Sequence, residues 1–412
     1  MIDINFLRQN PDKVKKSAES KGIDINIAHV AEIDLKYREI LSSVQKLRED
    51  RNRFAKEKNI EEGRRIKDQL EKEEQALNAI KGELESWIFK IPNLPKDDVK
   101  NGKDETENEI VRKVGTPRKF NFPLKDHLAL AEALDIIDVK QAAKISGTRF
   151  YFLKNEAVIL QFALRQFAFD TLTKQGFIPV LPPVLIKEDV MRGLGYMEKG
   201  GDEDMYIFEK DKMVFVGTSE QSLVPMHKDE ILNAKDLPKR YVGFSTCFRR
   251  EAGSYGKDTR GILRTHQFDK TEMVSFVKQG EDDKEHEYLL SIEEKFLQEL
   301  ELPYQVVKMC TGDLGFPTAR KYDLEGWIPS EAKYRELTSA STTTDFQARR
   351  LNIKYRDGDQ NHYVNILNGT AFSTRPLVAI IENFQEEDGS IIIPEVLKKY
   401  TGFEKIGQKK QL

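Results

Sequence analysis

The stretch that decides the fold runs from residue 247 to residue 272 and reads CFRREAGSYGKDTRGILRTHQFDKTE. A loop containing Gly and Asp separates two arms in which charged residues recur, which predicts a β-hairpin with a long loop. Arg249 lies on the first arm and Arg264 on the second. Arginine is a forked, permanently charged donor suited to phosphate oxygens, so the two side chains could hold one polyphosphate from two sides. Surface salt bridges on an edge hairpin would give the same spacing, and the pattern alone leaves both interpretations open.

The sequence around this hairpin, from about residue 118 onward, is typical of short strands separated by turns. The strand-like runs lie at 149–153, 205–208, 213–216 and 304–307, and helical stretches lie at about 155–175 and 282–300. Because a helix does not follow each strand, a parallel doubly wound sheet is not expected. The sequence also has no phosphate loop of the Gly-x-x-x-x-Gly-Lys type. This half of the chain therefore predicts an α+β fold in which helices flank an antiparallel sheet.

The first 110 residues have a different composition. They hold 22 Lys or Arg, 24 Asp or Glu and only four glycines, which is typical of long solvated helices. Apolar residues recur in alternating steps of four and three along 33–54 and again along 66–91, each time with one charged interruption. Asn59-Ile60-Glu61-Glu62-Gly63 lies between these two seams and predicts a helix stop and a turn.

Two seams of similar length joined by a short turn predict an antiparallel helical hairpin that projects as an arm. Two amphipathic helices packed on a globular core are the alternative, but the other faces of both helices are too charged to be buried. Residues 46–67, at the tip, hold nine Lys or Arg against five Asp or Glu. Pro92 ends the second helix, and the polar, acidic residues 96–117 are expected to form a connector.

The composition of the whole chain narrows the class of protein. Its 412 residues predict two or three domains, and a formal net charge of −3 means that a nucleic-acid partner would need a local basic patch. Two cysteines cannot build a disulfide scaffold and fit a reducing compartment. No apolar run approaches the roughly 20 residues that span a bilayer, and the acidic start MIDIN is unlike a signal peptide. We therefore expect a cytoplasmic protein without a membrane partner.

Several further motifs match one family over nearly the whole chain. They are Gly176-Phe177 with Pro183, Thr218-Ser219-Glu220, the hairpin from Phe248 to Glu272, the segments 311–316, 322–325, 334–339 and 345–350, and Asn368-Gly369-Thr370 with Arg375. With these motifs the sequence resembles the seryl-tRNA synthetases, which are class II aminoacyl-tRNA synthetases of the bacterial and eukaryotic type. The length of the hairpin motif makes the resemblance specific.

The resemblance implies both the fold and the division of the chain. We expect an α+β catalytic domain at 111–412, with the antiparallel sheet of class II synthetases flanked by helices. An N-terminal tRNA-binding domain is expected at 1–110, with the coiled-coil arm at about 28–91. The segment around Pro183 would build the interface of a homodimer.

The resemblance also implies the roles of individual residues. Arg249, Arg264 and Arg375 would be catalytic and would hold the phosphates of ATP. The expected ATP site comprises Arg249, Arg250, Glu251, Arg264, Thr265, Phe268, Glu336, Leu337, Thr338, Ser339 and Arg375, with Phe268 stacking on adenine. Glu336 and Ser339 would hold Mg²⁺. The expected L-serine site comprises Thr218, Ser219, Glu220, Arg249, Glu272, Asn368 and Thr370.

The implied activity is that of a serine–tRNA ligase. L-serine would be activated with ATP to seryl-adenylate, and the seryl group would pass to the 3′ end of tRNA(Ser), which the arm binds; tRNA(Sec) is a second expected tRNA. Neither step needs a protein nucleophile, because a carboxylate is already ionised at neutral pH.

Alternative interpretations remain open at single residues and for the whole chain. Phe268 could belong to the core, and Glu220 could be a surface helix cap. The chain could also be a catalytically inactive RNA-binding paralogue, a ligase that charges a carrier protein, or another class II synthetase.

Overall fold

The structure is a computed structural model that describes residues 1–198, 200–252 and 261–407. The predicted long loop of the hairpin falls on 253–260 and lies outside the described residues. The chain forms two compact units, Met1–Leu94 and Pro95–Leu412. The division expected from the resemblance, 1–110 and 111–412, stays a prediction.

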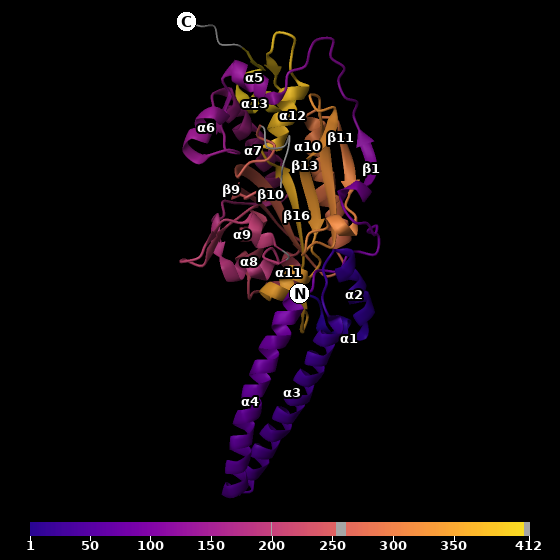
Figure 1. Ribbon diagram of the computed structural model, residues 1–412, viewed down its shortest axis with the longest axis vertical. Helices are drawn as coiled ribbons and strands as arrows, with labels where there is room; N and C mark the ends of the chain where they lie inside the picture. The colour runs from indigo at the N-terminus through magenta and orange to yellow at the C-terminus, as the bar shows by residue number, and fades with distance from the viewer. Residues whose placement is uncertain (199, 253–260, 408–412) are drawn as a thin grey trace. The chain divides into compact units, whose positions relative to one another are not determined.

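The first unit is helical. Two short helices, α1 (Ile4–Gln9) and α2 (Pro11–Ser20), precede two long ones, α3 (Ile27–Lys56) and α4 (Ile60–Phe89), which form an antiparallel hairpin (Figure 1). Each long helix begins at an asparagine that caps it. The Asn26 side chain accepts a hydrogen bond from the backbone N–H of His29, and the Asn59 side chain accepts one from that of Glu62.

The two seams predicted from the heptad spacing pack against each other along the hairpin. Val44 and Leu47 on α3 are buried with Ile66 and Leu70 on α4. The confirmed helical hairpin differs from the prediction at its turn. Residues 59–63 were expected to form the turn, but the first helix already ends at Lys56, and Gly63 lies inside α4. The asparagine starts the second helix rather than separating the two, because its side chain satisfies a free backbone N–H.

An eight-stranded sheet is the centre of the second unit (Figure 1). Its order is β1 (Glu109–Val114), β11 (Tyr304–Lys308), β12 (Arg320–Ile328), β13 (Lys333–Thr342), β16 (Asn365–Phe372), β10 (Gln267–Val277), β9 (Lys239–Phe248) and β4 (Ile178–Val180). All neighbours are antiparallel except β4 and β9, which run parallel. The antiparallel α+β architecture is therefore confirmed.

The connector expected at 96–117 is wrong in part, because β1 lies within it and pairs with β11 at the edge of the sheet. Three of its six residues are charged and its side chains are mostly exposed, which fits an edge strand. The strand expected at 149–153 is also shorter than predicted, since only β3 (Phe152–Leu153) is extended and paired, with β2 (Ile137–Asp138).

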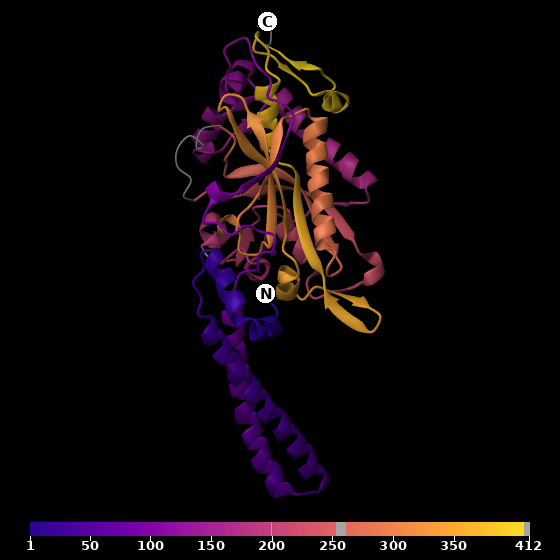
Figure 2. The same ribbon diagram turned by 90° about the vertical axis from the view of Figure 1, so that its right-hand side faces the viewer.

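Helices cover the sheet. Helix α7 (Glu156–Lys174) and α10 (Asp282–Glu299) match the two predicted helical stretches, and α10 runs along one face of the sheet (Figure 2). Helix α12 (Arg375–Asn383) follows β16. The other helices are α5 (His127–Leu134), α6 (Val139–Ser146), α8 (Glu188–Leu194), α9 (Glu220–Leu223), α11 (Phe346–Leu351) and α13 (Glu395–Thr401).

Small sheets extend this framework. They comprise β5 (Leu185–Lys187), β7 (Met213–Phe215) and β6 (Ile207–Phe208); β15 (Gln360–Tyr363), β14 (Lys354–Asp357) and β8 (Ile231–Asn233); and β17 (Ile391–Ile392) with β18 (Lys405–Ile406). Within the described ranges, every helix is too short or too polar to cross a membrane.

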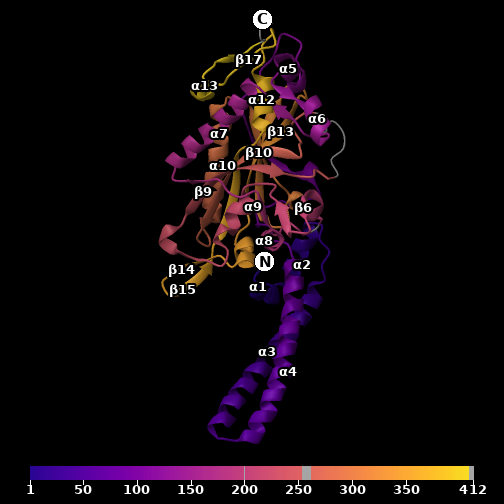
Figure 3. The same ribbon diagram turned by 90° about the vertical axis from the view of Figure 1, so that its left-hand side faces the viewer.

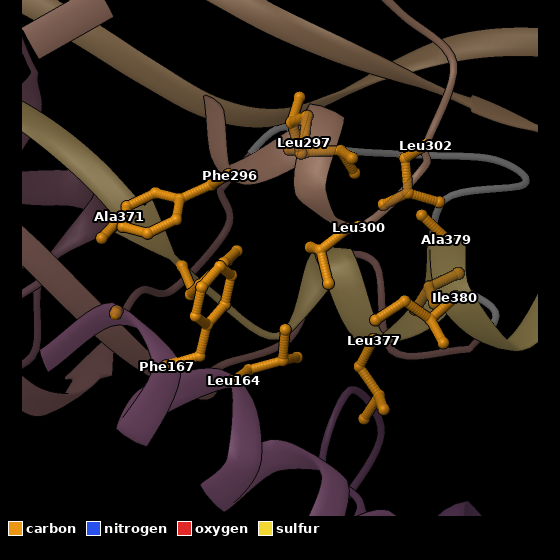
Figure 4. Packing of buried hydrophobic residues seen from close by; sticks show 14 of the residues in the cluster. Leu164, Phe167, Phe296, Leu297, Leu300, Leu302, Ala371, Leu377, Ala379 and Ile380 are labelled. Atoms are coloured by element: carbon orange, nitrogen blue, oxygen red, sulfur yellow. The ribbon is translucent and has the colours of Figure 1, made fainter. Parts of the chain in front are cut away.

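The main core lies between the sheet and the helices α7, α10 and α12 (Figure 4). Phe167 of α7 and Phe296 of α10 meet edge to face at 5.3 Å between ring centroids, and Phe296 lies 4.8 Å from the ring of Phe372 at the end of β16. Truncating such a buried Phe to Ala costs about 3–5 kcal/mol. This cluster therefore fixes the end of β16 and the start of α12, both of which carry predicted site residues.

Candidate active site

The predicted site residues gather on the face of the sheet opposite α10. Gly369 marks the covered face, because a Cβ there would lie 2.9 Å from Glu293 Oε1 of α10 and 3.1 Å from Met273. Side chains alternate along a strand, so Asn368 and Thr370 belong to the other face. Thr370 pairs across the ladder with Glu272. The central strands thus hold the site on a rigid platform.

A cavity opens on this face. Nine of the predicted residues line it, together with five that were not predicted. The lining comprises Arg249, Glu251, Ile262, Leu263, Thr265, Phe268, Lys270, Glu336, Leu337, Ser339, Thr370, Ser373, Thr374 and Arg375.

Arg249 and Phe268 meet in the cavity from the two arms of the hairpin. The Arg249 guanidinium carbon lies 5.3 Å from the centroid of the Phe268 ring, and its Nε donates to the carbonyl of Gly217 at 3.2 Å. His266 fixes the backbone of this arginine, because its carbonyl accepts from Arg249 N–H and its Nδ1 lies 3.0 Å from Arg249 O. Phe268 is half-buried and lines the cavity rather than the core.

Arg264 reaches the site through Glu251. Its Nη1 lies 3.3 Å from Glu251 Oε2, and Glu251 lines the cavity. The two residues come from opposite arms, as the hairpin interpretation requires. The alternative interpretation of the hairpin, salt bridges at the surface, is therefore correct only in part, because this ion pair exists but borders the cavity.

Arg375 closes the other side of the cavity. Its Nη1 lies 2.8 Å from Glu336 Oε2, and its Nε donates to the carbonyl of Leu263 at 3.3 Å. A β-bulge in β13 brings neighbouring residues of this strand to the same side of the cavity as Arg375. Leu324 pairs with Thr338 but Glu325 pairs with Glu336, which leaves Leu337 as the extra residue. Glu336, Leu337 and Ser339 consequently all line the cavity.

Glu336 is held ionised by its surroundings. Burial alone would raise the pKa of its carboxyl, but the positive charges of Arg375 and Lys321 outweigh it and hold the pKa of Glu336 well below its ordinary value. Among the described residues, no group of three or more His, Cys, Asp or Glu side chains could hold a metal ion. A hard cation here would thus have one carboxylate and one hydroxyl from the protein, which fits Mg²⁺ bound largely by phosphates and water.

A buried charged cluster continues the site beside Thr370. Lys270 Nζ lies 2.7 Å from Glu272 Oε2 and donates to Thr218 Oγ1 at 3.1 Å. Oε1 of Glu272 is buried without a hydrogen-bond partner among the described residues. Burial, with a smaller contribution from the nearby Glu220, raises the pKa of Glu272 to about 7, although Lys270 opposes the shift.

Glu220 belongs to the same cluster. It is 4% exposed at the first position of α9, so the surface-cap interpretation is wrong. Its carboxylate accepts a hydrogen bond from the hydroxyl of Tyr196. Burial raises the pKa of Glu220, and burial beside this carboxyl raises the pKa of Tyr196 well above its ordinary value.

Three residues that were predicted to belong to the ATP or L-serine site point away from the cavity. Arg250 is exposed, with its guanidinium 5.9 Å from the ring centroid of Tyr206. The Ser219 hydroxyl is buried against that of Ser245 at 2.8 Å. Thr338 donates to Glu293 Oε2 at 2.7 Å on the α10 side of the sheet. Asn368 is buried on the site face beside Thr370, outside the lining of the cavity.

Sequence reasoning missed Lys270, Tyr196, and the cavity-lining residues Ile262, Leu263, Ser373 and Thr374. Lys270 could have been found, because it lies between Phe268 and Glu272 on one strand and alternation puts all three on one face. Tyr196 had no such signal. It follows α8 and reaches Glu220 only through the tertiary fold.

The tip of the helical hairpin is the second candidate surface. All nine Lys and Arg side chains at 46–67 are exposed. Arg48, Arg53 and Arg65 form ion pairs with Glu74, Asp50 and Glu62 respectively. The tip thus presents a basic surface to solvent.

Comparison with known families supports both parts of the chain. Residues 1–95 match the seryl-tRNA synthetase N-terminal domain. Residues 206–384 match the tRNA synthetase class II core domain (G, H, P, S and T).

Similar proteins match the chain over its full length. A serine–tRNA ligase of Dictyoglomus turgidum is 40% identical over 425 residues, covering 100% of both chains. The crystal structure of seryl-tRNA synthetase from Pyrococcus horikoshii complexed with ATP superposes with a TM-score of 0.93 at 38% identity, covering 100% of both chains. The cytoplasmic serine–tRNA ligase of Naegleria fowleri in complex with AMP gives a TM-score of 0.90 at 30% identity, covering 100% of this chain and 99% of that one.

Proposed function

Because this chain belongs to the seryl-tRNA synthetase family, we propose that it is a serine–tRNA ligase that activates L-serine with ATP and transfers the seryl group to tRNA(Ser). The observation that carries this proposal is the meeting of Arg249, Arg375 and Phe268 in one cavity, next to the buried Lys270–Glu272 cluster. Arg249, Arg375 and Phe268 suit a nucleoside triphosphate, and the Lys270–Glu272 cluster suits a small zwitterion.

In the first step the serine carboxylate attacks the α-phosphate of ATP and pyrophosphate leaves. Arg249 would hold the α-phosphate, and Arg264 and Arg375 would hold the outer phosphates. Their work is to position the reactants and neutralise developing charge. The fixed guanidinium groups favour this role, because Arg249 and Arg375 are already oriented by the carbonyls of Gly217 and Leu263.

The adenine would lie against Phe268, whose ring faces the cavity. Glu251 would accept a hydrogen bond from the adenine amino group. Backbone groups of Thr265 and Leu337, next to the cavity, would complete the binding of the nucleotide.

Serine would enter the buried cluster. Oε1 of Glu272, which has no hydrogen-bond partner among the described residues, would accept a hydrogen bond from the serine hydroxyl or ammonium. Thr218, Glu220, Asn368 and Thr370 would surround the bound serine. A site built to bond a buried hydroxyl rejects alanine, because its own polar groups are then left unpaired. The extra methyl of threonine would be excluded by volume.

Glu336 and Ser339 would hold Mg²⁺ together with the phosphates. The bound cation supplies charge neutralisation at the phosphate oxygens. Arg375 shares the Glu336 carboxylate and keeps it ionised, which suits a ligand of a hard cation.

In the second step a ribose hydroxyl at the 3′ end of the tRNA attacks the activated carbonyl. The arm α3–α4 would bind the tRNA body through the basic tip, reading its shape and phosphates more than its bases. Charging of tRNA(Sec) by the same surface stays a prediction.

We also propose a homodimer formed through α7 and β4. Apolar side chains are exposed there on adjacent elements: Ile159 and Phe162 on α7, and Ile178 and Leu181 in and after β4. Leu181 is 79% exposed, which is unusual for a leucine beside an open sheet edge. A two-fold axis along this edge would cover all four side chains.

The experiment that tests the function is ATP–pyrophosphate exchange with the purified chain and serine, threonine, alanine or glycine. The proposal expects exchange with serine at least about 100-fold faster than with alanine. An inactive paralogue would show none, and another class II synthetase would prefer a different amino acid. Charging of serine tRNA then separates a tRNA ligase from a ligase that charges a carrier protein.

A further inference from the structure

A carboxyl group that none of the roles above uses lies on the other side of the sheet from the proposed site. Glu293 belongs to α10, and its side chain is fully buried. Helix α10 packs across β13 and β16 and lies beside the central strands in Figure 3. The hydroxyl of Thr338 donates to Glu293 Oε2 at 2.7 Å, whereas Oε1 is buried with no hydrogen-bond partner among the described residues. A buried polar atom of this kind is costly, so its presence needs a reason.

The surroundings of Glu293 favour a neutral carboxyl group. An ionised carboxylate that is buried with one hydroxyl as its partner is strongly unfavourable. Burial raises the pKa of Glu293 well above its ordinary value, although the hydrogen bond from Thr338 opposes the shift. A neutral carboxyl group still has a carbonyl oxygen that accepts from Thr338. Glutamine has the same shape and the same acceptor, so it should be able to replace this residue.

Glycine at 369 makes room for this carboxyl group. A Cβ on Gly369 would lie 2.9 Å from Glu293 Oε1, which is too close for a side chain. Gly369 pairs with Ala340 of β13, and Ala340 lies two positions after Thr338 on the same face of that strand. The carboxyl group is therefore held between the backbone of β16 and the hydroxyl of Thr338, where the two strands pair.

Thr338 belongs to the bulged segment that carries both proposed Mg²⁺ ligands. Leu337 is the extra residue of the bulge. Glu336 and Ser339 line the cavity, while Thr338 turns to α10. A bulge disrupts the regular ladder and changes the direction of the side chains around it. The contact between Thr338 and Glu293 therefore helps to decide which residues of this segment face the site.

We propose that Glu293 is a positioning residue of the ligase reaction, an inference that rests on the proposed function. By holding Thr338 it fixes the bulge, so that Glu336 and Ser339 face the phosphates and Mg²⁺. Glu293 lies on the far side of the sheet and acts only through Thr338. Outer groups that orient metal ligands change metal affinity about 10–100-fold when they are removed.

The test measures how strongly Mg²⁺ tightens the binding of ATP to the full-length protein. Calorimetry without serine, so that no adenylate forms, gives the ratio of the ATP dissociation constants without and with Mg²⁺. Glu293→Leu keeps a side chain of similar size but removes the acceptor, and it should lower this ratio about tenfold. Glu293→Gln keeps the acceptor and should stay within about twofold of the wild-type ratio.

Thermal unfolding separates this role from a merely structural one. Glu293→Leu leaves the Thr338 hydroxyl buried without its acceptor, so Tm should fall. Adding Thr338→Val replaces both partners with apolar groups, so Tm should recover. The Mg²⁺ effect should stay lost in this double variant, because nothing holds the bulge. Glu285→Leu is the matched control, since Glu285 is buried on the same helix but pairs with Arg240 at 2.6 Å. It should lower Tm and keep the wild-type Mg²⁺ effect.

The inference is overturned if Glu293→Leu keeps the wild-type Mg²⁺ effect, if Glu293→Gln loses as much of it as Glu293→Leu, or if the double variant regains it together with Tm. Wild-type ATP binding that does not respond to Mg²⁺ would overturn it as well. Serine-dependent pyrophosphate exchange by the wild-type protein reports separately on the proposed function. Its presence leaves that function standing whatever the variants do, and its absence overturns the proposed function itself.

Discussion

Lys270 Nζ lies 2.7 Å from Glu272 Oε2, two residues further along the same strand, and the pair is buried on the face that carries the site. Lys270 also donates to Thr218, so one ammonium group joins two residues of the proposed serine site. Its charge lowers a Glu272 pKa that burial otherwise raises.

Replacing Lys270 with methionine should therefore raise the pKa of Glu272 above its value of about 7, by about one to three units. If ionised Glu272 binds serine, the acidic limb of the kcat/KM profile for serine in pyrophosphate exchange moves to higher pH. The loss is then largest near pH 7 and shrinks as the pH rises past the new pKa. Glu272→Gln is the reference, because it removes the titration. If the acidic limb of the kcat/KM profile stays at the wild-type pH in Lys270→Met, the role proposed for Lys270 and Glu272 is contradicted.

The proposed Mg²⁺ site predicts a changed metal requirement. Ser339→Ala should raise the Mg²⁺ concentration needed for half-maximal exchange by about tenfold or more, since it removes one of two protein ligands. Ser291→Ala on the exposed face of α10 is the control. Glu336→Gln is a less specific test of Mg²⁺ binding, because it also removes the ion-pair partner of Arg375. The same Mg²⁺ dependence in Ser339→Ala and wild type would exclude the serine as a ligand.

The basic tip of the arm predicts a separation of the two reaction steps. Reversing Lys58, Arg64 and Arg65 to glutamate should raise the KM for tRNA at least about tenfold, because phosphate contacts are lost and like charges are introduced. Pyrophosphate exchange should stay at the wild-type rate. Lys15→Glu with Lys16→Glu on α2 changes charge away from the tip and serves as control. Normal tRNA charging by the tip variant would refute this function of the arm.

The exposed apolar side chains of α7 and β4 predict an interface. Phe162→Glu should convert the dimer into a monomer in sedimentation velocity, because a charge buried without a partner is strongly unfavourable. Ile231→Glu, on the exposed strand β8, should leave the mass unchanged. A wild-type protein that sediments as a monomer would argue against the dimer at once.

Much of the fold could be predicted from local pattern. The heptad seams at 33–54 and 66–91 predicted the packing of the two long helices, which buries Val44 against the partner helix. The errors occur where tertiary pairing decides. Strand β1 lies in a segment expected to be a connector, and its pairing with β11 at the edge of the sheet decides its structure. Residues 149–151, Arg-Phe-Tyr, are irregular, since Arg149 has φ +62°.

The site was predicted less completely for the same reason. A motif identifies residues but not their direction, and the bulge at Leu337 turns Thr338 toward α10 while Glu336 and Ser339 reach the cavity. Ser219 belongs to its motif yet bonds Ser245 in the interior. Tyr196 contacts Glu220 across 24 positions of sequence, a relationship that no local spacing encodes.

The central claim is that fixed guanidinium groups bind the phosphates of ATP, and Arg249→Ala tests it most directly. Serine-dependent pyrophosphate exchange should fall about 100-fold or more in kcat, as when one preorganised donor is removed from a transition state. Arg356→Ala, which removes an exposed guanidinium on β14, should exchange at the wild-type rate. Wild-type exchange by Arg249→Ala would contradict the account.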